Sequence, residues 1–412
     1  MRAAGREKAM SVAYQEIELR EVCTHIGVGL AMAVTPYMTT SGVKLIRNQN
    51  IKPNRFDDSS VVYLDPRFAA SQASKTIRVN DLVIVRTGAN IGDACVVPGD
   101  FDGAQSFTTL VVRVDQECVS PGYLAQFINS SFGRSEVERL MAGGGKGNLN
   151  SGELERFRVK LLPFEAQKQV ETLLACWDTA IEKTGDLIAA KEQHYAHELS
   201  RLISRGGHPR SHVGAFASEV SERNRGGNEA RVLSVTNSHG FVLPEDQFER
   251  RVASADLSNY KVVGRGQYAY NPSRINVGSI TRLDAWDDGV LSPMYVVFGL
   301  DESKVDSDYF LHWLNSHEAR ERIKNGAQGS VRETVSFTEF AALSIPLPGR
   351  PTQSAIARYL NVLRQEIALI GQSVLALQTQ KRGLMQKLLT GQGRLPLPQT
   401  AYAPEMYERG RI

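Results

Sequence analysis

Hydrophobic residues recur at alternating steps of three and four along two stretches of the chain. This spacing places the apolar side chains on one helix face, and a pattern sustained over four heptads predicts a long helix with a seam for a partner. We expect these helices at residues 161–205 and 348–392. The expected seam consists of Leu174, Trp177, Ile181 and Ile188 in the first helix and of Leu360, Leu363, Ile367, Ile370, Val374, Leu377, Leu384 and Leu388 in the second.

The two seams occupy one common register. Leu174 and Leu360 lie 186 positions apart, and the same offset relates the residues that follow them. Lys191 and Lys381 fall within the seams, so neither helix is uniformly apolar. Each helix could pack on its own domain, or the two could pair with each other. Sustained heptads in a shared register favour pairing.

The offset of 186 positions also relates residues that lie well before the helices. Tyr123 matches Tyr309 in this register. Gln167 matches Gln353 in the same way. A fixed period of this length indicates duplicated domains rather than a solenoid of short repeats. Upstream of Asn80 the register is lost, so we expect the two copies to differ most in their N-terminal halves and any ligand preferences to diverge there.

Each copy has the pattern of a mixed α and β module. We expect globular modules at 1–160 and 206–347, each followed by its long helix, and a loose tail at 393–412. The expected strands are 82–86, 108–114 and 158–162 in the first copy and 268–271, 294–298 and 342–346 in the second, with helices at 121–141 and 307–325.

Composition narrows the class of protein only partly. The 412 residues carry 48 Lys and Arg against 45 Asp and Glu, a net charge of +3, which gives no argument for nucleic acid. No apolar run approaches the roughly 20 residues that span a bilayer, so we expect a soluble, cytoplasmic protein. The four cysteines are scattered without CxxC spacing, which favours reduced thiols over disulfides or zinc ligands.

Several short strings imitate active sites without completing one. Asp65-Pro66-Arg67-Phe68 lacks the second proline of the amine-binding motif of amino-methyltransferases, and no Gly-rich cofactor loop follows a strand at a suitable distance. The glycine-rich stretch 143–147 lacks the spacing of a phosphate-binding loop. The histidines have no carboxylate or cysteine partners at metal-ligand spacing. We therefore expect no catalytic residue and no metal or cofactor site in this chain.

The recurring combination of a module, a strand, a Pro-rich turn with a Gln and a long helix resembles the specificity subunits of type I restriction-modification systems. The strings that carry the resemblance include VNDLVIVRTGANIGDACVV and SPGYLAQFINSS in the first copy and SPMYVVF and TQSAIARYL in the second. The resemblance covers about residues 15–392. One departure is Asn80-Asp81, which stands where the family usually has Gly-Asp.

The resemblance implies an α+β fold with two tandem target recognition domains and an antiparallel coiled coil formed by the two helices. It also implies a noncatalytic subunit that recognises a bipartite, asymmetric site in double-stranded DNA, one half per domain. Two methyltransferase (modification) subunits would dock on it, and restriction/translocase subunits would join. S-adenosylmethionine, ATP and Mg would be bound in those partner subunits only, and no membrane would be involved.

Base reading needs Arg, Lys, Asn or Gln in the grooves, with other cations on phosphates. We expect such residues in the divergent halves and polar loops, although an exposed cation is more often a solvated surface group. The candidate DNA-binding residues are Arg47, Asn48, Gln49, Lys52, Arg55, Arg86 and Lys146 in the first copy and Asn237, Arg250, Arg251, Lys261, Arg274 and Arg332 in the second.

Two other functions compete with this interpretation. A single-chain DNA methyltransferase or nuclease is disfavoured by the missing cofactor loop. A dimerising scaffold without a DNA role is favoured by the near-neutral charge and the long helices. The recognised sequence, its spacer, the methylated base and the presence of a functional restriction subunit do not follow from the sequence.

Overall fold

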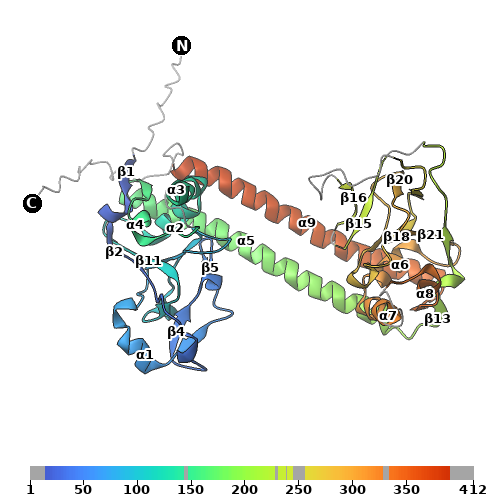
Figure 1. The fold of residues 1–412 in the computed structure, drawn as a ribbon, viewed down its shortest axis with the longest axis horizontal. Helices are drawn as coiled ribbons and strands as arrows, with labels where there is room; N and C mark the ends of the chain where they lie inside the picture. The colour runs from blue at the N-terminus through green and yellow to red at the C-terminus, as the bar shows by residue number, and fades with distance from the viewer. Residues whose placement is uncertain are drawn as a thin grey trace, which may run out of the picture. The chain divides into compact units, whose positions relative to one another are not determined.

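The computed structural model describes residues 14–142, 147–227, 231–237, 239–244, 256–327 and 334–389 (Figure 1). The chain divides into two units, one comprising Met1–Thr184 with Ser373–Ile412 and the other Gly185–Gln372. Both dividing points fall inside the long helices α5 (Phe164–Leu199) and α9 (Arg350–Leu389). Each unit therefore consists of a globular part and about half of each long helix.

The described residues of the first unit form twelve strands and four α-helices besides its share of α5 and α9. Its strands are β1 (Gln15–Glu18), β2 (Cys23–Val28), β3 (Met38–Thr39), β4 (Val43–Ile46), β5 (Ile51–Lys52), β6 (Arg55–Phe56), β7 (Val62–Leu64), β8 (Leu82–Val85), β9 (Ala94–Val96), β10 (Gln105–Ser106), β11 (Thr109–Val114) and β12 (Arg158–Leu161). Its α-helices are α1 (Pro66–Ser71), α2 (Pro121–Asn129), α3 (Ser131–Ala142) and α4 (Ser151–Leu154).

The second unit repeats much of this order. Its strands are β13 (Arg210–His212), β14 (Ala217–Val220), β15 (Ser234–Thr236), β16 (Gly240–Val242), β17 (Lys261–Gly264), β18 (Tyr268–Tyr270), β19 (Ile280–Arg282), β20 (Asp288–Leu291), β21 (Val296–Leu300) and β22 (Ser344–Pro346). Its α-helices are α6 (Ser307–Leu314), α7 (His317–Ala327) and α8 (Phe337–Ala341), and a π-helical segment, η6 (Ser200–Ser204), extends α5.

One four-stranded sheet recurs in both units with the same order. It runs β2-β11-β8-β9 in the first unit and β14-β21-β18-β19 in the second. The register also recurs, because Leu82 faces Val112 in the first sheet and Tyr268 faces Phe298 in the second. The prediction of a duplicated α+β module is therefore confirmed by the strand order and by the pairing of individual residues.

Each predicted helix between sheet and long helix is in fact two helices. In the first unit α2 ends before Ser130, whose hydroxyl accepts the Gly133 N–H at 3.2 Å at the start of α3. In the second unit the Ser316 hydroxyl accepts the Ala319 N–H at 3.1 Å at the start of α7. A serine that caps the following helix stops the preceding one, although the apolar period continues across it.

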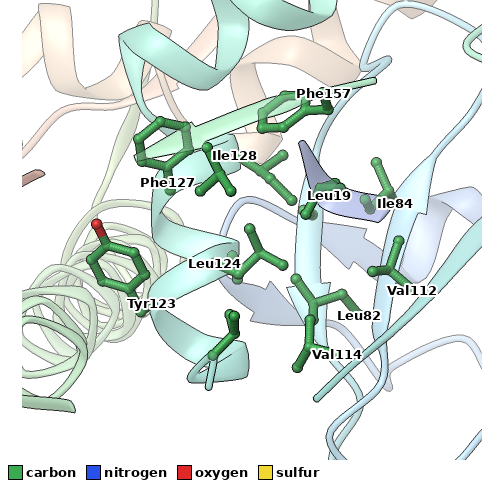
Figure 2. Close-up of a cluster of buried hydrophobic side chains, with 14 of the residues drawn as sticks. Leu19, Leu82, Ile84, Val112, Val114, Tyr123, Leu124, Phe127, Ile128 and Phe157 are labelled. Atoms are coloured by element: carbon green, nitrogen blue, oxygen red, sulfur yellow. The ribbon is translucent and has the colours of Figure 1, made fainter. Parts of the chain in front are cut away.

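The core of the first unit lies between α2 and the recurring sheet. Figure 2 shows Leu124 and Ile128 of α2 directed toward Leu82 and Leu19, with the Tyr123 hydroxyl directed away from the sheet. Helix ends join this core, since Leu174 of α5 and Leu388 of α9 belong to the same buried cluster. Burying a large aliphatic side chain contributes about 2 kcal/mol, so these contacts fix the helix ends to the unit.

The two long helices contact each other within each unit. In the first unit Lys381 of α9 donates to the Asp178 carboxylate of α5 at 2.5 Å. In the second unit Lys191 of α5 pairs with Glu366 of α9 at 2.6 Å. In the second unit the two helix segments run antiparallel, because Lys191 contacts Glu366 whereas the later Tyr195 contacts the earlier Arg364. Every predicted seam residue is buried or half-buried.

The N-terminal halves of the globular parts differ. The first unit adds a second four-stranded sheet of order β10-β4-β7-β3, whereas the second unit has the two-stranded pairs β15-β16 and β17-β20. Asn80 has φ 67° in the first unit, and Asn tolerates this left-handed conformation better than most residues do. The asparagine therefore fills a position where glycine would also fit.

Candidate nucleic-acid interface

Three segments of the first unit meet beside the end of β8. The short helix η3 (Asn48–Asn50) contacts the loop after β8, because the Asn48 amide donates to both the carbonyl and the hydroxyl of Thr87 at 3.3 Å. Arg86 of that loop donates to the Asn150 side chain at 3.1 Å. These bonds gather Asn48, Arg86 and Asn150, which come from positions far apart in the chain, at one edge of the unit.

The residues on either side of Asn48 are held by a single serine. Arg47 donates through its guanidinium to the Ser60 carbonyl, and the Gln49 amide donates to the Ser60 hydroxyl at 2.7 Å. Gln49 itself is exposed, whereas Arg47 and Asn48 are half-buried. Held in this way, the three polar side chains lose little further entropy when they bind a ligand.

Three of these candidates keep spare hydrogen-bonding capacity. Within the described part of the chain, the buried atoms Arg47 Nε, Asn48 Oδ1 and Arg86 Nε have no hydrogen-bond partner. Buried polar atoms are usually satisfied by protein or water, so unpaired ones call for an explanation such as a ligand or an ordered water. Asn48 Oδ1 is an acceptor and the two Nε atoms are donors, which is the mixture that base edges require.

The hairpin of β5 and β6 carries the other two described candidates of the first unit. Lys52 is half-buried, and Arg55 is exposed at the strand that pairs with it. Arg55 lies 3.3 Å from the Glu182 carboxylate of α5, with about half of each side chain exposed. A surface pair of this kind contributes little and breaks readily, so Arg55 remains available to a phosphate.

In the second unit, Asn237 and Arg274 lie on neighbouring turns. Asn237 follows β15 in the turn to β16, and Arg274 lies in the loop between β18 and β19. The Ser279 hydroxyl donates to the Val235 carbonyl at 2.7 Å and ties this loop to β15. Both candidate side chains are exposed. The arrangement is the counterpart of Asn48 beside the loop after β8.

Lys261 departs from the expectation of an exposed cation. The residue is 7% exposed, and its ammonium lies 3.4 Å from the Glu219 carboxylate. Alternation along a strand explains the burial, because Val263, two positions on, is fully buried on the same side of β17. Lys261 therefore stabilises the second unit internally. The other four candidates lie outside the described residues: Lys146, Arg250, Arg251 and Arg332.

Some residues at these edges were not among the candidates. Asn150 and Thr87 contact the candidates directly in the first unit. Val277 of the second unit, three positions after Arg274, is 60% exposed, which is unusual for a large apolar side chain beside a polar loop. Asn150 follows the glycine-rich stretch and lies in an Asn-rich string. That composition was the signal from which Asn150 could have been predicted as an interface residue. Val277 could have been found from its position in the loop that carries Arg274.

Chemical groups typical of catalysis are engaged structurally. The Asp65 carboxylate accepts the N–H groups of Arg67 and Phe68 and so caps α1. Burial raises the pKa of the Cys23 and Cys95 thiols to about 12, which keeps them protonated and weakly nucleophilic. Among the residues that the structure describes, no group of His, Cys, Asp and Glu could hold a metal ion, and no helix could cross a membrane.

Comparison with curated proteins shows similarity along most of the chain. No family model matches it. It is 19% identical over 382 residues to the type I restriction enzyme MjaX specificity subunit of Methanocaldococcus jannaschii, over 86% of this chain and 88% of that protein. It is 21% identical over 387 residues to the type I restriction enzyme StySPI specificity subunit of Salmonella potsdam, over 86% of this chain and 82% of that protein.

Solved structures show a similar fold. The S subunit of a type I restriction-modification system from M. genitalium matches with a TM-score of 0.57 and 13% identity, over 93% of this chain and 98% of that one. A chain from work on complex assembly and conformational transition of the type I R-M system matches with a TM-score of 0.57 and 16% identity, over 92% and 98%. The resemblance of this chain to the specificity subunits of type I restriction-modification systems is therefore confirmed, by sequence and by fold.

Proposed function

We propose that this chain is the noncatalytic DNA-specificity subunit of a type I restriction-modification complex and that each unit reads one half of a bipartite, asymmetric site. The observation that carries the proposal is a scaffold built twice with different polar edges. Asn48 and Arg86 mark that edge in the first unit, and Asn237 and Arg274 mark it in the second. Equal scaffolds with unequal edges suit two readers of two different half-sites.

The chemistry of these edges suits double-stranded DNA. An Asn or Gln amide can form two hydrogen bonds with adenine, and an arginine fork can form two with guanine. The first unit offers Asn48, Gln49 and Arg86 together, and the second offers Asn237 and Arg274. The remaining cations, such as Arg55, would contact phosphates. The near-neutral charge is consistent with partner subunits that supply much of the attraction for the DNA backbone.

Catalysis would belong to partners that dock on the long helices. We propose two methyltransferase subunits there, with restriction/translocase subunits joining the complex and with S-adenosylmethionine, ATP and Mg bound in those partners. Exposed apolar side chains on α5 and α9 support docking, since large apolar residues at a surface often mark protein interfaces. They are Leu173, Leu187, Tyr359, Val362, Leu369 and Leu375, between 38% and 64% exposed.

The helices that run through both units would also set the spacing of the half-sites. One helical turn of DNA rises about 34 Å, so a change in reader separation must change the preferred spacer. Deleting one heptad from α5 and the matching heptad from α9 should therefore shorten the spacer in the methylated sites. An unchanged spacer would remove this part of the proposal.

Direct binding tests the proposal. The full chain with its copurifying partners should retard DNA that contains the site methylated in the source genome, and competitor DNA without it should not displace the complex. Asn48→Ala and Arg274→Ala should each weaken binding about 5- to 100-fold, the usual effect of losing a two-bond base contact. Arg382→Ala, on the exposed side of α9, serves as the matched control and should have no effect.

The alternatives predict different outcomes in the same preparation. A scaffold without a DNA role would bind its partners normally and would retard no DNA. A single-chain methyltransferase or nuclease would modify or cut DNA when purified without partners. Either result would replace the specificity-subunit proposal.

A further inference from the structure

A cavity of about 490 Å³ lies within the second unit. Its wall is formed by the end of α5, the π-helical segment η6, the loop after α6, the start of α7 and one residue of α9. Three arginines line it: Arg205, which directly follows η6, Arg320 of α7 and Arg364 of α9. Convergence of guanidinium groups from separate elements distinguishes the cavity from a run of surface charges along one helix.

One of the three arginines is fixed by an aromatic ring. The Arg364 guanidinium lies 5.4 Å from the centre of the Tyr195 ring. Tyr195 is 8% exposed, and its hydroxyl is hydrogen-bonded to His312 Nδ1 at 2.8 Å. A ring held in this way restrains the guanidinium above it, so less entropy is lost when Arg364 binds a ligand.

The positive charge of the cavity is not neutralised from within. Glu318 is the one carboxylate in the described wall of the cavity. It is already paired with Arg210 at 2.5 Å and with Arg322 at 2.9 Å, neither of which lines the cavity. Within the described part of the chain, the guanidinium groups of Arg205 and Arg320 form no ion pair or hydrogen bond. Three cations therefore face a space in which the one acid is engaged elsewhere.

The first unit provides an internal control, because the duplication places matching residues at matching positions. Arg134 corresponds to Arg320, and it is bonded to the Asp93 carboxylate and to the Ile91 carbonyl. Asp93 corresponds to Ser279 in the second unit, so Arg320 has lost the carboxylate that its counterpart uses.

A second exchange increases the difference between the units. Asp178 of the first unit, which is bonded to Lys381, corresponds to Arg364 of the second. Lys381 in turn corresponds to Tyr195. The charges at these positions are compensated in the first unit, whereas the second unit keeps two positive charges and no acid. Both substitutions act in the same direction, toward an anion.

We propose that this cavity binds a phosphoryl group. Guanidinium forks match the geometry of phosphate oxygens and bind them through paired, charge-assisted hydrogen bonds. The first N–H groups of α7, an 11-residue helix that begins at His317 in the wall, add favourable partial charge. The volume exceeds the needs of a single phosphate and lies in the range of small-molecule sites, so a ligand with two or more phosphates suits it.

The phosphoryl group could come from a free phosphorylated compound or from a nucleic-acid backbone. Calorimetric titration of the full chain with inorganic pyrophosphate tests the shared chemistry. We expect saturable binding to one site. Arg364→Asp, which installs the residue of the first unit, and Arg320→Ala should each weaken it at least about tenfold, as expected when a charge-assisted bond is lost. Arg382→Ala should leave it unchanged.

One further variant and a displacement measurement complete the test. Arg364→Gln removes the positive charge without introducing a negative one and should also weaken binding, so a folding defect in Arg364→Asp would not hide the result. A short DNA duplex that displaces pyrophosphate would assign the backbone as the source, and failure to displace it would assign a free compound. The proposal is overturned if pyrophosphate does not saturate the chain, or if the Arg364→Gln and Arg320→Ala proteins bind it as tightly as the unchanged chain does.

Discussion

The two units share a polar framework and differ in the residues that fill their cores. In the first unit Gln167 accepts the Ser120 N–H and donates to the carbonyls of Cys118 and Leu162. In the second unit Gln353 makes the same three bonds, to residues 186 positions later: Asp306, Lys304 and Pro348. Tyr123 and Tyr309 likewise donate to matching carbonyls on β12 and β22.

The apolar core behaves in the opposite way. Where the core of the first unit has aliphatic side chains, the core of the second unit has aromatic side chains at the equivalent positions. The exchanges are Leu82 for Tyr268, Ile84 for Tyr270, Val112 for Phe298, Leu124 for Phe310 and Leu154 for Phe340. Phe310 has its ring centre 5.3 to 6.3 Å from those of Phe216, Tyr268, Phe298 and Trp313.

The difference shows which features specify this module. Bonds from a buried side chain to three backbone groups leave no room for variation, because each lost bond strands a buried donor or acceptor. A core tolerates large changes in shape when its neighbours change with it. The hydrogen-bonded framework is therefore the same in both units, whereas the apolar core residues can differ between them.

The largest expected effect comes from the framework. Gln167→Ala or Gln353→Ala, at side chains that are each 1% exposed, should destabilise the affected unit by about 3–5 kcal/mol, since three backbone groups lose their partner. Hydrogen exchange resolved by unit measures this, with exposed Gln380→Ala as the control. Losses of very different size in the two units would contradict a shared framework.

An intermediate effect is expected from exchanging core residues between the units. Phe310→Leu should leave a cavity and Leu124→Phe should overfill its site, and each should cost about 1–3 kcal/mol because the neighbours no longer match. Urea unfolding of the single variants provides the measurement. If either substitution left the free energy of unfolding unchanged, the two cores would accept each other's residues. That result would contradict the claim that each core is matched to its own neighbours.

The smallest expected effect is on the stability of the second unit at acidic pH. Burial, aided by Arg364, lowers the pKa of His312 from its ordinary value of 6.5, although Asn361 and Asp308 oppose the shift. The unfolded chain then takes up this proton at higher pH than the folded unit, so the stability from neutral His312 is full above about pH 6.5 and is lost as pH falls. Gln126 occupies this position in the first unit and does not titrate.

His312→Gln should therefore reduce the acid sensitivity of the second unit toward that of the first. Unfolding midpoints of both proteins at about pH 7.5 and pH 5.5 provide the comparison, on either side of the ordinary histidine pKa. An equal loss of stability in the two proteins would show that other groups govern the response to acid.

Much of this fold follows from the sequence because the duplication doubles the signal. The heptads at Leu360 and its successors predict α9 within a few residues, and the matching of Gln167 with Gln353 is part of the register that predicts duplicated domains. The breaks at Ser130 and Ser316 were missed, because apolar periodicity continues across a serine that caps the next helix. The second sheet of the first unit has no counterpart among the described residues of the second unit, so the duplication gave no signal for it.

The candidate interface was less predictable for a physical reason. Residue type identifies groups that can read bases, but it does not tell which of them the chain brings together. Asn48 and Arg86 meet Thr87 and Asn150 only through tertiary contacts. Lys261 shares a strand face with buried Val263, and that alternation could have excluded it from the exposed cations.

The most direct measurement exchanges one unit's reading surface while leaving the other intact. Residues 206–340 are replaced by the corresponding segment of a relative such as the StySPI specificity subunit, and methylated positions are then sequenced in cells that carry the exchanged chain with its partners. Two independent readers predict that one half of the methylated site changes and the other half stays the same. Unchanged methylation, or a change in both halves, would contradict the assignment of one half-site to each unit.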